Sequence, residues 1–214
     1  MMQHNPYDLM IIKEGVIPQK DIEELMELTV QEKTPASVVD VDINTDKNVD
    51  KKEDKPHEVK KNIRDTSWYN IPPHIMSKLE AAIQGCYQMY VQPKYNCKLT
   101  GVTDIQLLGY APKGHYLLHN DGEQYNNETE KWEKIMDRDI SYLFYLNEEF
   151  GGGEIEFPQL GLTIKPKKGM MIAFPSYHEF SHQVHPVTWG NRYAIVTWMA
   201  TEKKIYRTFS NAHL

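Results

Sequence analysis

The stretch HYLLHND, residues 115–121, places two histidines and an aspartate close together in the chain. If this stretch is a strand, His119 and Asp121 point to the same face, because alternate side chains of a strand share a side. An imidazole beside a carboxylate suits a divalent metal such as Fe(II), Mn(II) or Zn(II). Such a pair also occurs as a plain hydrogen-bonded surface contact, so a metal site requires a third ligand from elsewhere in the chain.

Short apolar segments surround this stretch from about residue 102 onward. They are separated by glycine, proline and asparagine, which is the punctuation expected between short strands. About seven or eight such strands predict an all-β sandwich or barrel for residues 101–200. The polar run 122–137 interrupts them, and its length favours a functional loop over a simple turn. The segments are TDIQLLGY, HYLLHND, ISYLFYL, GEIEFP, LTIKP, MMIAFP and RYAIVTWM.

The first hundred residues have a different character. Residues 1–35 predict a strand and then a helix, and a second helix begins at Pro72 and Pro73 and continues at helical spacing to Tyr90. Between them, residues 36–62 are dense in charges of both signs, which predicts a mobile loop. We therefore expect one domain, 1–214, in which residues 1–100 give helical support to a β core.

Bulk composition restricts the classes of function. The chain has 214 residues, 40% of them hydrophobic and 25% charged, as in ordinary globular domains. Its net charge of −6 disfavours nucleic acid or an anionic membrane as a partner. Two cysteines give no disulfide framework, and neither a leader peptide nor a membrane span is evident. A cytoplasmic location is the expectation, and the oligomeric state cannot be read from the sequence.

Candidates for the third ligand lie about sixty residues further on. His178, His182 and His185 fall within YHEFSHQVHPV, and a strand running back beside the first could bring one of them to His119. Two histidines and one carboxylate form a facial triad, which leaves about three positions of an octahedron open. That openness separates an oxygen-activating iron site from a closed structural zinc site.

The residues around these positions add a longer pattern. Upstream the chain reads YAPKGHYLLHND from residue 110, and downstream it reads HQVHPVTWGNRY from residue 182. Between them lie RDISYLFYLN, from residue 138, and GGEIEFP, from residue 152. Over roughly residues 60–200, this order of elements closely resembles the prolyl 4-hydroxylase branch of the Fe(II)- and 2-oxoglutarate-dependent dioxygenases. The resemblance implies a mainly β (α+β) fold, a double-stranded β-helix or jelly-roll with supporting N-terminal helices.

The resemblance also implies roles for individual residues. His119, Asp121 and His182 match the iron ligands of that branch, while His115 is expected at the rim and His178 and His185 as non-ligands. Arg192 matches the basic residue that pairs with the distal carboxylate of 2-oxoglutarate, and arginine offers a planar fork for it. Tyr145 matches a tyrosine that hydrogen-bonds the same carboxylate, and Tyr110 one near the metal-bound end. An alternative is that Tyr145 and Tyr110 are aromatic residues of the core.

The activity implied is hydroxylation of prolyl residues in a peptide or protein. It would use Fe(II), 2-oxoglutarate and O2, release succinate and CO2, and take ascorbate as a reductant. Candidates for substrate contact are Tyr125, Trp132 and Trp198, and packing alone also explains Trp198. Two alternatives stay open: a hydroxylase of a free amino acid or other small molecule, and a non-catalytic jelly-roll binding module. A nucleic-acid demethylase is disfavoured because position 198 holds tryptophan where that class carries a second arginine.

Overall fold

The structure is a computed structural model, and it describes residues 6–30, 33–36 and 60–202. Most of the charged loop expected at 36–62 lies outside the described residues. No helix in the described part of the chain is both long enough and apolar enough to cross a membrane.

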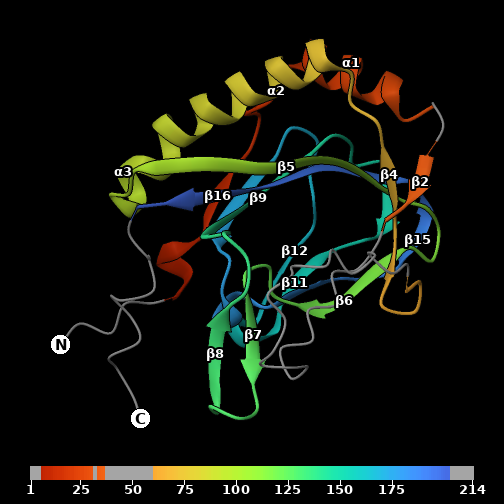
Figure 1. Cartoon of the computed structure of the whole chain (residues 1–214). Coiled ribbons are helices and arrows are strands. Elements are labelled where there is room, and N and C mark those ends of the chain that lie inside the picture. Colours follow the sequence, from red (N-terminus) through yellow and green to blue (C-terminus); the bar gives the residue numbers. More distant parts are fainter. Residues whose placement is uncertain (1–5, 31–32, 37–59, 203–214) are drawn as a thin grey trace, which may run out of the picture.

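Helices and sheets are stacked in layers. Figure 1 shows the helices α1 and α2 over one face of a large antiparallel sheet, with a smaller sheet beyond its other face. Two packed antiparallel sheets with helices on one outer side form the predicted jelly-roll, and the fold class is confirmed.

The larger sheet forms the wall between the helices and the interior. Among the described residues its strand order is β1-β13-β9-β16-β5-β4-β2, and each neighbouring pair is antiparallel. The strands are β1 (Ile11–Lys13), β13 (Met171–Pro175), β9 (Ile140–Tyr145), β16 (Arg192–Thr201), β5 (Leu99–Tyr110), β4 (Ser67–Tyr69) and β2 (Lys33–Pro35).

The smaller sheet contains the first five residues of HYLLHND. Its order within the described residues is β12-β11-β14-β6-β3, and two short hairpins complete the strands. The smaller sheet consists of β12 (Leu162–Ile164), β11 (Ile155–Phe157), β14 (His182–Val184), β6 (His115–His119) and β3 (Arg64–Asp65). The hairpins are β10 (Phe150–Gly152) with β15 (Val187–Gly190), and β7 (Glu123–Asn126) with β8 (Lys131–Lys134).

The expectation of a loop at 122–137 was wrong in part, because the run folds as the β7–β8 hairpin. Its turn is closed by Asn126, whose side-chain oxygen accepts the backbone N–H of Glu128 and of Thr129 at 2.9 and 3.2 Å. Asparagine stabilises turns in this way. In Figure 1 the hairpin lies on the side of the molecule away from α1 and α2.

The helices follow the predicted order with one difference. α1 spans Gln19–Leu28 and α2 begins at Pro73, as expected, but α2 ends at Cys86. The π-helical segment η2 (Tyr87–Val91) and the short α3 (Gln92–Tyr95) follow it. Pro93 explains the break, since it has no N–H to give to the residue four positions back. The remaining elements are the short 3₁₀ turns η1 (Pro6–Leu9), η3 (Pro158–Leu160) and η4 (His178–Phe180).

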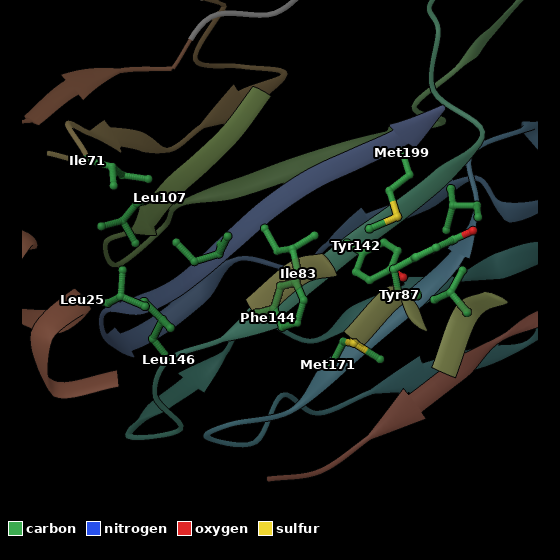
Figure 2. Close-up of a cluster of buried hydrophobic side chains, with 14 of the residues drawn as sticks. Leu25, Ile71, Ile83, Tyr87, Leu107, Tyr142, Phe144, Leu146, Met171 and Met199 are labelled. Carbon is green, nitrogen blue, oxygen red and sulfur yellow. The ribbon is translucent and has the colours of Figure 1, made fainter. Parts of the chain in front are cut away.

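The larger sheet is buried on both faces, and β9 shows how. Tyr142 and Phe144 belong to the core shared with the helices, where Figure 2 shows them near Ile83. Leu143 and Tyr145 belong to a second apolar cluster, which includes Phe157 of the smaller sheet. Alternation along one strand thus gives one face to the helices and the other to the interior between the sheets.

Candidate active site

Two neighbouring strands of the smaller sheet bring the candidate histidines together. β6 and β14 run antiparallel, and His119 lies directly opposite His182 in their register. Their ring centroids are 4.4 Å apart. Side chains directly opposite on antiparallel strands point to the same face of the sheet, so the pairing of these strands by itself places two imidazoles side by side.

Asp121 completes the cluster from the turn that follows β6. Its Oδ1 lies 3.7 Å from Nε2 of His119, and its Oδ2 lies 3.9 Å from Nε2 of His182. The ligand atoms of the three residues all lie within 4.8 Å of one another. Two imidazole nitrogens and one carboxylate oxygen are the donor set of a facial triad.

Both imidazoles are oriented by the backbone. Nδ1 of His119 is 2.8 Å from the carbonyl oxygen of Leu117, and Nδ1 of His182 is 3.1 Å from that of Phe180. A carbonyl can only accept, so each Nδ1 carries the proton and each Nε2 presents a lone pair to the cluster. His182 is also fixed by ring contacts with Phe157 and Phe174, at 5.4 and 4.9 Å between centroids.

The charge states of two residues in the cluster suit a cation. Burial and the neighbouring His182 lower the pKa of His119 from 6.5 to about 3, so this imidazole is neutral near pH 7. Burial alone would raise the pKa of Asp121, but His182, His119 and a hydrogen bond from Ser141 outweigh it and lower that pKa to about 2. Near neutral pH the cluster therefore offers a neutral imidazole at His119 and a carboxylate at Asp121.

Arg192 lies on the larger sheet, opposite Tyr110 in the pairing of β16 with β5. Its guanidinium carbon is 4.6 Å from the ring centroid of Tyr110 and 5.0 Å from that of Tyr145. Arg192 is only 1% exposed. Its Nε and Nη2 and the Tyr145 hydroxyl are buried with no hydrogen-bond partner among the described residues.

Two unsatisfied nitrogens on a buried guanidinium are unfavourable, which indicates that an anion belongs beside them. Burial raises the pKa of Tyr145, and the Arg192 cation offsets only part of this, so the phenol is neutral and can donate to the same anion. Gly153 leaves space here: its φ is +65°, and a Cβ at this position would come within 3.0 Å of Cδ of Arg192. A carboxylate matches these donors in charge and geometry.

The other histidines are engaged away from the cluster. His115 has Nδ1 3.0 Å from the carbonyl oxygen of Lys113. His185 Nε2 lies 2.7 Å from Oε2 of Glu156. Neither belongs to the group of ligand atoms around Asp121, in keeping with the positions expected for them.

His178 belongs to a second group of potential ligands, together with Glu123 and Glu179. Its Nδ1 and its backbone N–H both donate to Oε2 of Glu123, at 2.8 and 3.0 Å. Its ring stacks on Trp132, with centroids 4.6 Å apart and planes 1° from parallel. These contacts fasten the β7–β8 hairpin to η4 and account for the position of His178 without a metal.

The candidates for substrate contact fall into two places. Trp198 is 6% exposed, and the guanidinium carbon of Arg138 lies 3.6 Å from its ring centroid. Nη1 of Arg138 in turn lies 3.5 Å from the backbone oxygen of Asp121, so this pair borders the cluster. Tyr125 and Trp132 are partly exposed on the β7–β8 hairpin, with their rings 5.6 Å apart.

Three polar residues near Asp121 had no role in the sequence reading. Ser141 donates a 2.6 Å hydrogen bond to Oδ2 of Asp121, and the hydroxyl of Ser176 lies 2.8 Å from that of Ser141. Arg138 is the third. The available signal was a polar serine inside the apolar run ISYLFYL, although nothing in the sequence shows which carboxylate it faces.

Comparison with known proteins agrees with this geometry. Residues 105–200 match the family model of the 2OG-Fe(II) oxygenase superfamily. The matched span contains the His119, Asp121 and His182 cluster and Arg192. A putative prolyl 4-hydroxylase of Acanthamoeba polyphaga mimivirus is 28% identical over 120 residues, which are 51% of this chain and 50% of that protein. The family match, the cluster and this sequence similarity together confirm the predicted resemblance to the prolyl 4-hydroxylase-like branch of these oxygenases. Fe(II), 2-oxoglutarate and O2 are accordingly the cofactors that this family match supports.

Particular relatives are prolyl hydroxylases. Prolyl 3-hydroxylase 2 of Mus musculus is 41% identical over 75 residues, which are 33% of this chain and 10% of that protein. A Trichoplax adhaerens prolyl hydroxylase, solved with a peptide fragment of the hypoxia inducible factor oxygen degradation domain, has a TM-score of 0.68 at 16% identity, covering 97% of this chain and 88% of that one. A Pseudomonas putida prolyl-4-hydroxylase has a TM-score of 0.64 at 18% identity, covering 91% and 94%. The chain thus spans about a tenth of the length of the mouse protein and about half that of the mimivirus protein, and the structural likeness shows the fold.

Proposed function

We propose that this chain is an Fe(II)- and 2-oxoglutarate-dependent hydroxylase that acts on prolyl residues in a peptide or protein. The observation that carries the proposal is the convergence of a His-Asp-His cluster and an unpaired buried arginine on the interior between the two sheets. The cluster offers a divalent metal two imidazoles and a carboxylate, and Arg192 offers an anion a partner.

In this proposal His119, Asp121 and His182 hold Fe(II). When bound, the iron and 2-oxoglutarate together supply the oxidation, in which O2 is consumed, succinate and CO2 are released and a C–H bond is hydroxylated. The chain keeps both Nε2 atoms directed at the metal by fixing each Nδ1–H on a backbone carbonyl. Partners of this kind fix the tautomer and orientation of metal-binding histidines.

The same proposal assigns Arg192 and Tyr145 to the distal carboxylate of 2-oxoglutarate. Arg192 brings two buried N–H donors and Tyr145 a neutral hydroxyl, none of which has a partner among the described residues. Tyr110 flanks the guanidinium at 4.6 Å and would line the cosubstrate pocket. Strands β5 and β9 hold both aromatic rings in place beside β16.

A prolyl substrate is supported by the names of the four relatives described above, each of which is named as a prolyl hydroxylase. Trp198 with Arg138, beside Asp121, and the exposed Tyr125 and Trp132 are the surfaces that we assign to it. No observation favours hydroxylation of a free amino acid, or binding without catalysis, over hydroxylation of a prolyl residue. Ascorbate as a reductant and a cytoplasmic location stay predictions.

Turnover of 2-oxoglutarate with proline-containing peptides tests the proposal. Purified protein with Fe(II), 2-oxoglutarate and ascorbate should release succinate, and mass spectrometry should find one added oxygen on a prolyl residue. His119→Ala should abolish both products. His115→Ala is the matched control, because His115 lies on the same strand outside the cluster. Absence of iron-dependent succinate release with every peptide, or full activity in His119→Ala, would refute the proposal.

A further inference from the structure

A chain of hydroxyl groups ends on the carboxylate of Asp121. Ser141 Oγ lies 2.6 Å from Oδ2 of Asp121, and Ser176 Oγ lies 2.8 Å from Ser141 Oγ. A serine hydroxyl has one proton, and the ionised carboxylate can only accept. Ser141 therefore donates to Asp121 and Ser176 donates to Ser141, which fixes the direction of both hydrogen bonds.

Packing alone gives no reason for these hydroxyls. Ser141 and Ser176 are 0% and 1% exposed, and Ser141 is the one hydrophilic residue of β9, whose sequence is ISYLFY. Burying a hydroxyl is unfavourable unless it is hydrogen-bonded. The partner that compensates Ser141 is the Asp121 carboxylate, so the strand places its polar side chain at the candidate metal centre.

The backbone next to Asp121 is held by the same two segments. A Cβ at Gly122 would lie 2.8 Å from the carbonyl oxygen of Arg138 and 2.9 Å from that of Ser176. Only glycine permits so close an approach. The main chain after Asp121 and the side chain of Asp121 are thus both fixed between the residues that precede β9 and the residue that follows β13.

This arrangement treats the two carboxylate oxygens differently. Both oxygens border the cluster, Oδ1 at 3.7 Å from Nε2 of His119 and Oδ2 at 3.9 Å from Nε2 of His182, but only Oδ2 accepts a hydrogen bond, from Ser141, among the described residues. Because a lone pair of Oδ2 accepts this short hydrogen bond, Oδ2 is a poorer metal ligand than Oδ1. A carboxylate that binds through both oxygens would also occupy an additional coordination position, which a facial triad must leave open.

We propose that Ser141, supported by Ser176, is a positioning residue that holds Asp121 as a ligand through Oδ1 alone. This inference rests on the proposed function, because it needs a metal at the His119, Asp121 and His182 cluster. At metal sites generally, hydrogen-bond partners behind a ligand orient it toward the metal, and here two buried serines would do so for Asp121.

Titration of the metal-free protein with Co(II), followed by calorimetry and visible absorption, tests the inference without turnover. Ser141→Ala should weaken Co(II) binding by roughly 10- to 100-fold, as loss of such a partner typically does. It should also change the absorption of bound Co(II), which depends on the number and arrangement of ligands. Ser176→Ala should have the same effect more weakly, and Ser141→Thr, which keeps a hydroxyl, should restore the wild-type affinity and spectrum.

Thr197→Val is the matched control. It removes another buried hydroxyl from the neighbouring strand β16, one that donates to the carbonyl oxygen of Thr103 at 2.8 Å. It should lower thermal stability and leave Co(II) affinity unchanged. A purely structural role for Ser141 predicts this same result for Ser141→Ala.

The outcomes separate the inference from the proposed function. If wild-type protein binds no Co(II), the metal centre is refuted and both fall. If wild-type protein binds Co(II) and Ser141→Ala binds it equally well with the same spectrum, the inference alone is overturned. Should Ser141→Ala fail to fold, Ser176→Ala decides, and an unchanged affinity and spectrum there would overturn the role of the hydroxyl pair.

Discussion

The histidine end and the arginine end of the interior differ in what the chain supplies. Around His119, Asp121 and His182, both Nδ1 atoms and Oδ2 of Asp121 have hydrogen-bond partners within the protein. Around Arg192, two guanidinium nitrogens and the Tyr145 hydroxyl have none among the described residues. The first end is arranged in advance, whereas the second needs an additional molecule to complete it.

This difference has an energetic meaning. A buried charge without a partner destabilises the fold by several kcal/mol, and a bound anion removes that penalty. The cluster of His119, Asp121 and His182 carries no such penalty, because its hydrogen bonds form with or without a metal. Stability without ligands and affinity for ligands should therefore change in opposite directions at the arginine end.

The largest effect is expected for Arg192→Leu. With Co(II) bound, affinity for 2-oxoglutarate should fall about 100-fold or more, since losing one partner of a buried charge pair costs about 2–5 kcal/mol. The ligand-free protein should gain about 1–3 kcal/mol in its free energy of unfolding. Calorimetry and urea denaturation measure the two quantities. If Arg192→Leu were less stable than wild type and bound 2-oxoglutarate equally well, Arg192 would not be the unsatisfied partner of this anion.

At the histidine end, the largest change should come with pH. The pKa of His119 is lowered from 6.5 to about 3, so between these values the unfolded chain binds a proton that the folded chain does not. The metal-free protein should therefore lose up to about 1.4 kcal/mol of stability per unit as the pH falls from 6.5 toward 3. Urea denaturation across this range should give a flatter dependence for His119→Asn. Equal slopes would show that His119 is not held neutral.

Tyr145→Phe tests the arginine end by removing only the hydroxyl group of Tyr145. The variant loses one hydrogen-bond donor to the distal carboxylate, which should weaken 2-oxoglutarate binding about tenfold. It also removes a buried hydroxyl that has no partner among the described residues, so the ligand-free protein should be at least as stable as wild type. Thermal denaturation and calorimetry check both, and a clear loss of stability without ligand would count against the assigned role.

The smallest effect is expected for Trp132→Ala, outside both ends. It removes the ring that stacks on His178 at 4.6 Å and should cost about 0.5–1.5 kcal/mol of stability. Affinities for Co(II) and 2-oxoglutarate should stay at their wild-type values, because within the described residues the hydrogen bonds that leave the hairpin go to Asn120, Asp137, Asp139 and His178 and to neither group of donors. A weakened affinity for either would extend the site to the hairpin.

Much of this arrangement could be predicted from the sequence. Each of the seven predicted segments contains a strand, and the pattern that starts at His182 identified the histidine that lies opposite His119. The expectation that Asp121 shares a strand with His119 was wrong, because β6 ends at His119 and Asp121 lies in the turn that follows. The strand signal is reliable here because short apolar runs alternate with turn residues. The third ligand was harder to predict, since three histidines lie within eight residues. Only the resemblance to a known pattern separated His182 from the other two.

Other features depend on contacts between distant residues. The hydrogen bond of Ser141 to Asp121 joins β9 to the turn after β6, and no local pattern reveals such a pairing. The polar residues of the β7–β8 hairpin predict a loop, whereas in the structure they pair as two strands and the Asn126 side chain closes the turn between them. The chain is helical through Tyr90 as the apolar spacing predicts, but the change to π-helical hydrogen bonding at Tyr87–Val91 leaves no mark in that spacing.

The pairing of His119 with His182 has a consequence for the lifetime of the protein. A metal held by both residues would cross-link positions about sixty residues apart, and closing a long loop restricts the unfolded chain more than closing a short one. Metal loss would then expose the intervening chain to proteases as well as stop turnover. Proteolysis within residues 119–182 should be slower with Co(II) than without it, and His119→Ala should remove the difference. Under iron limitation, the amount of this protein and its specific activity would fall together.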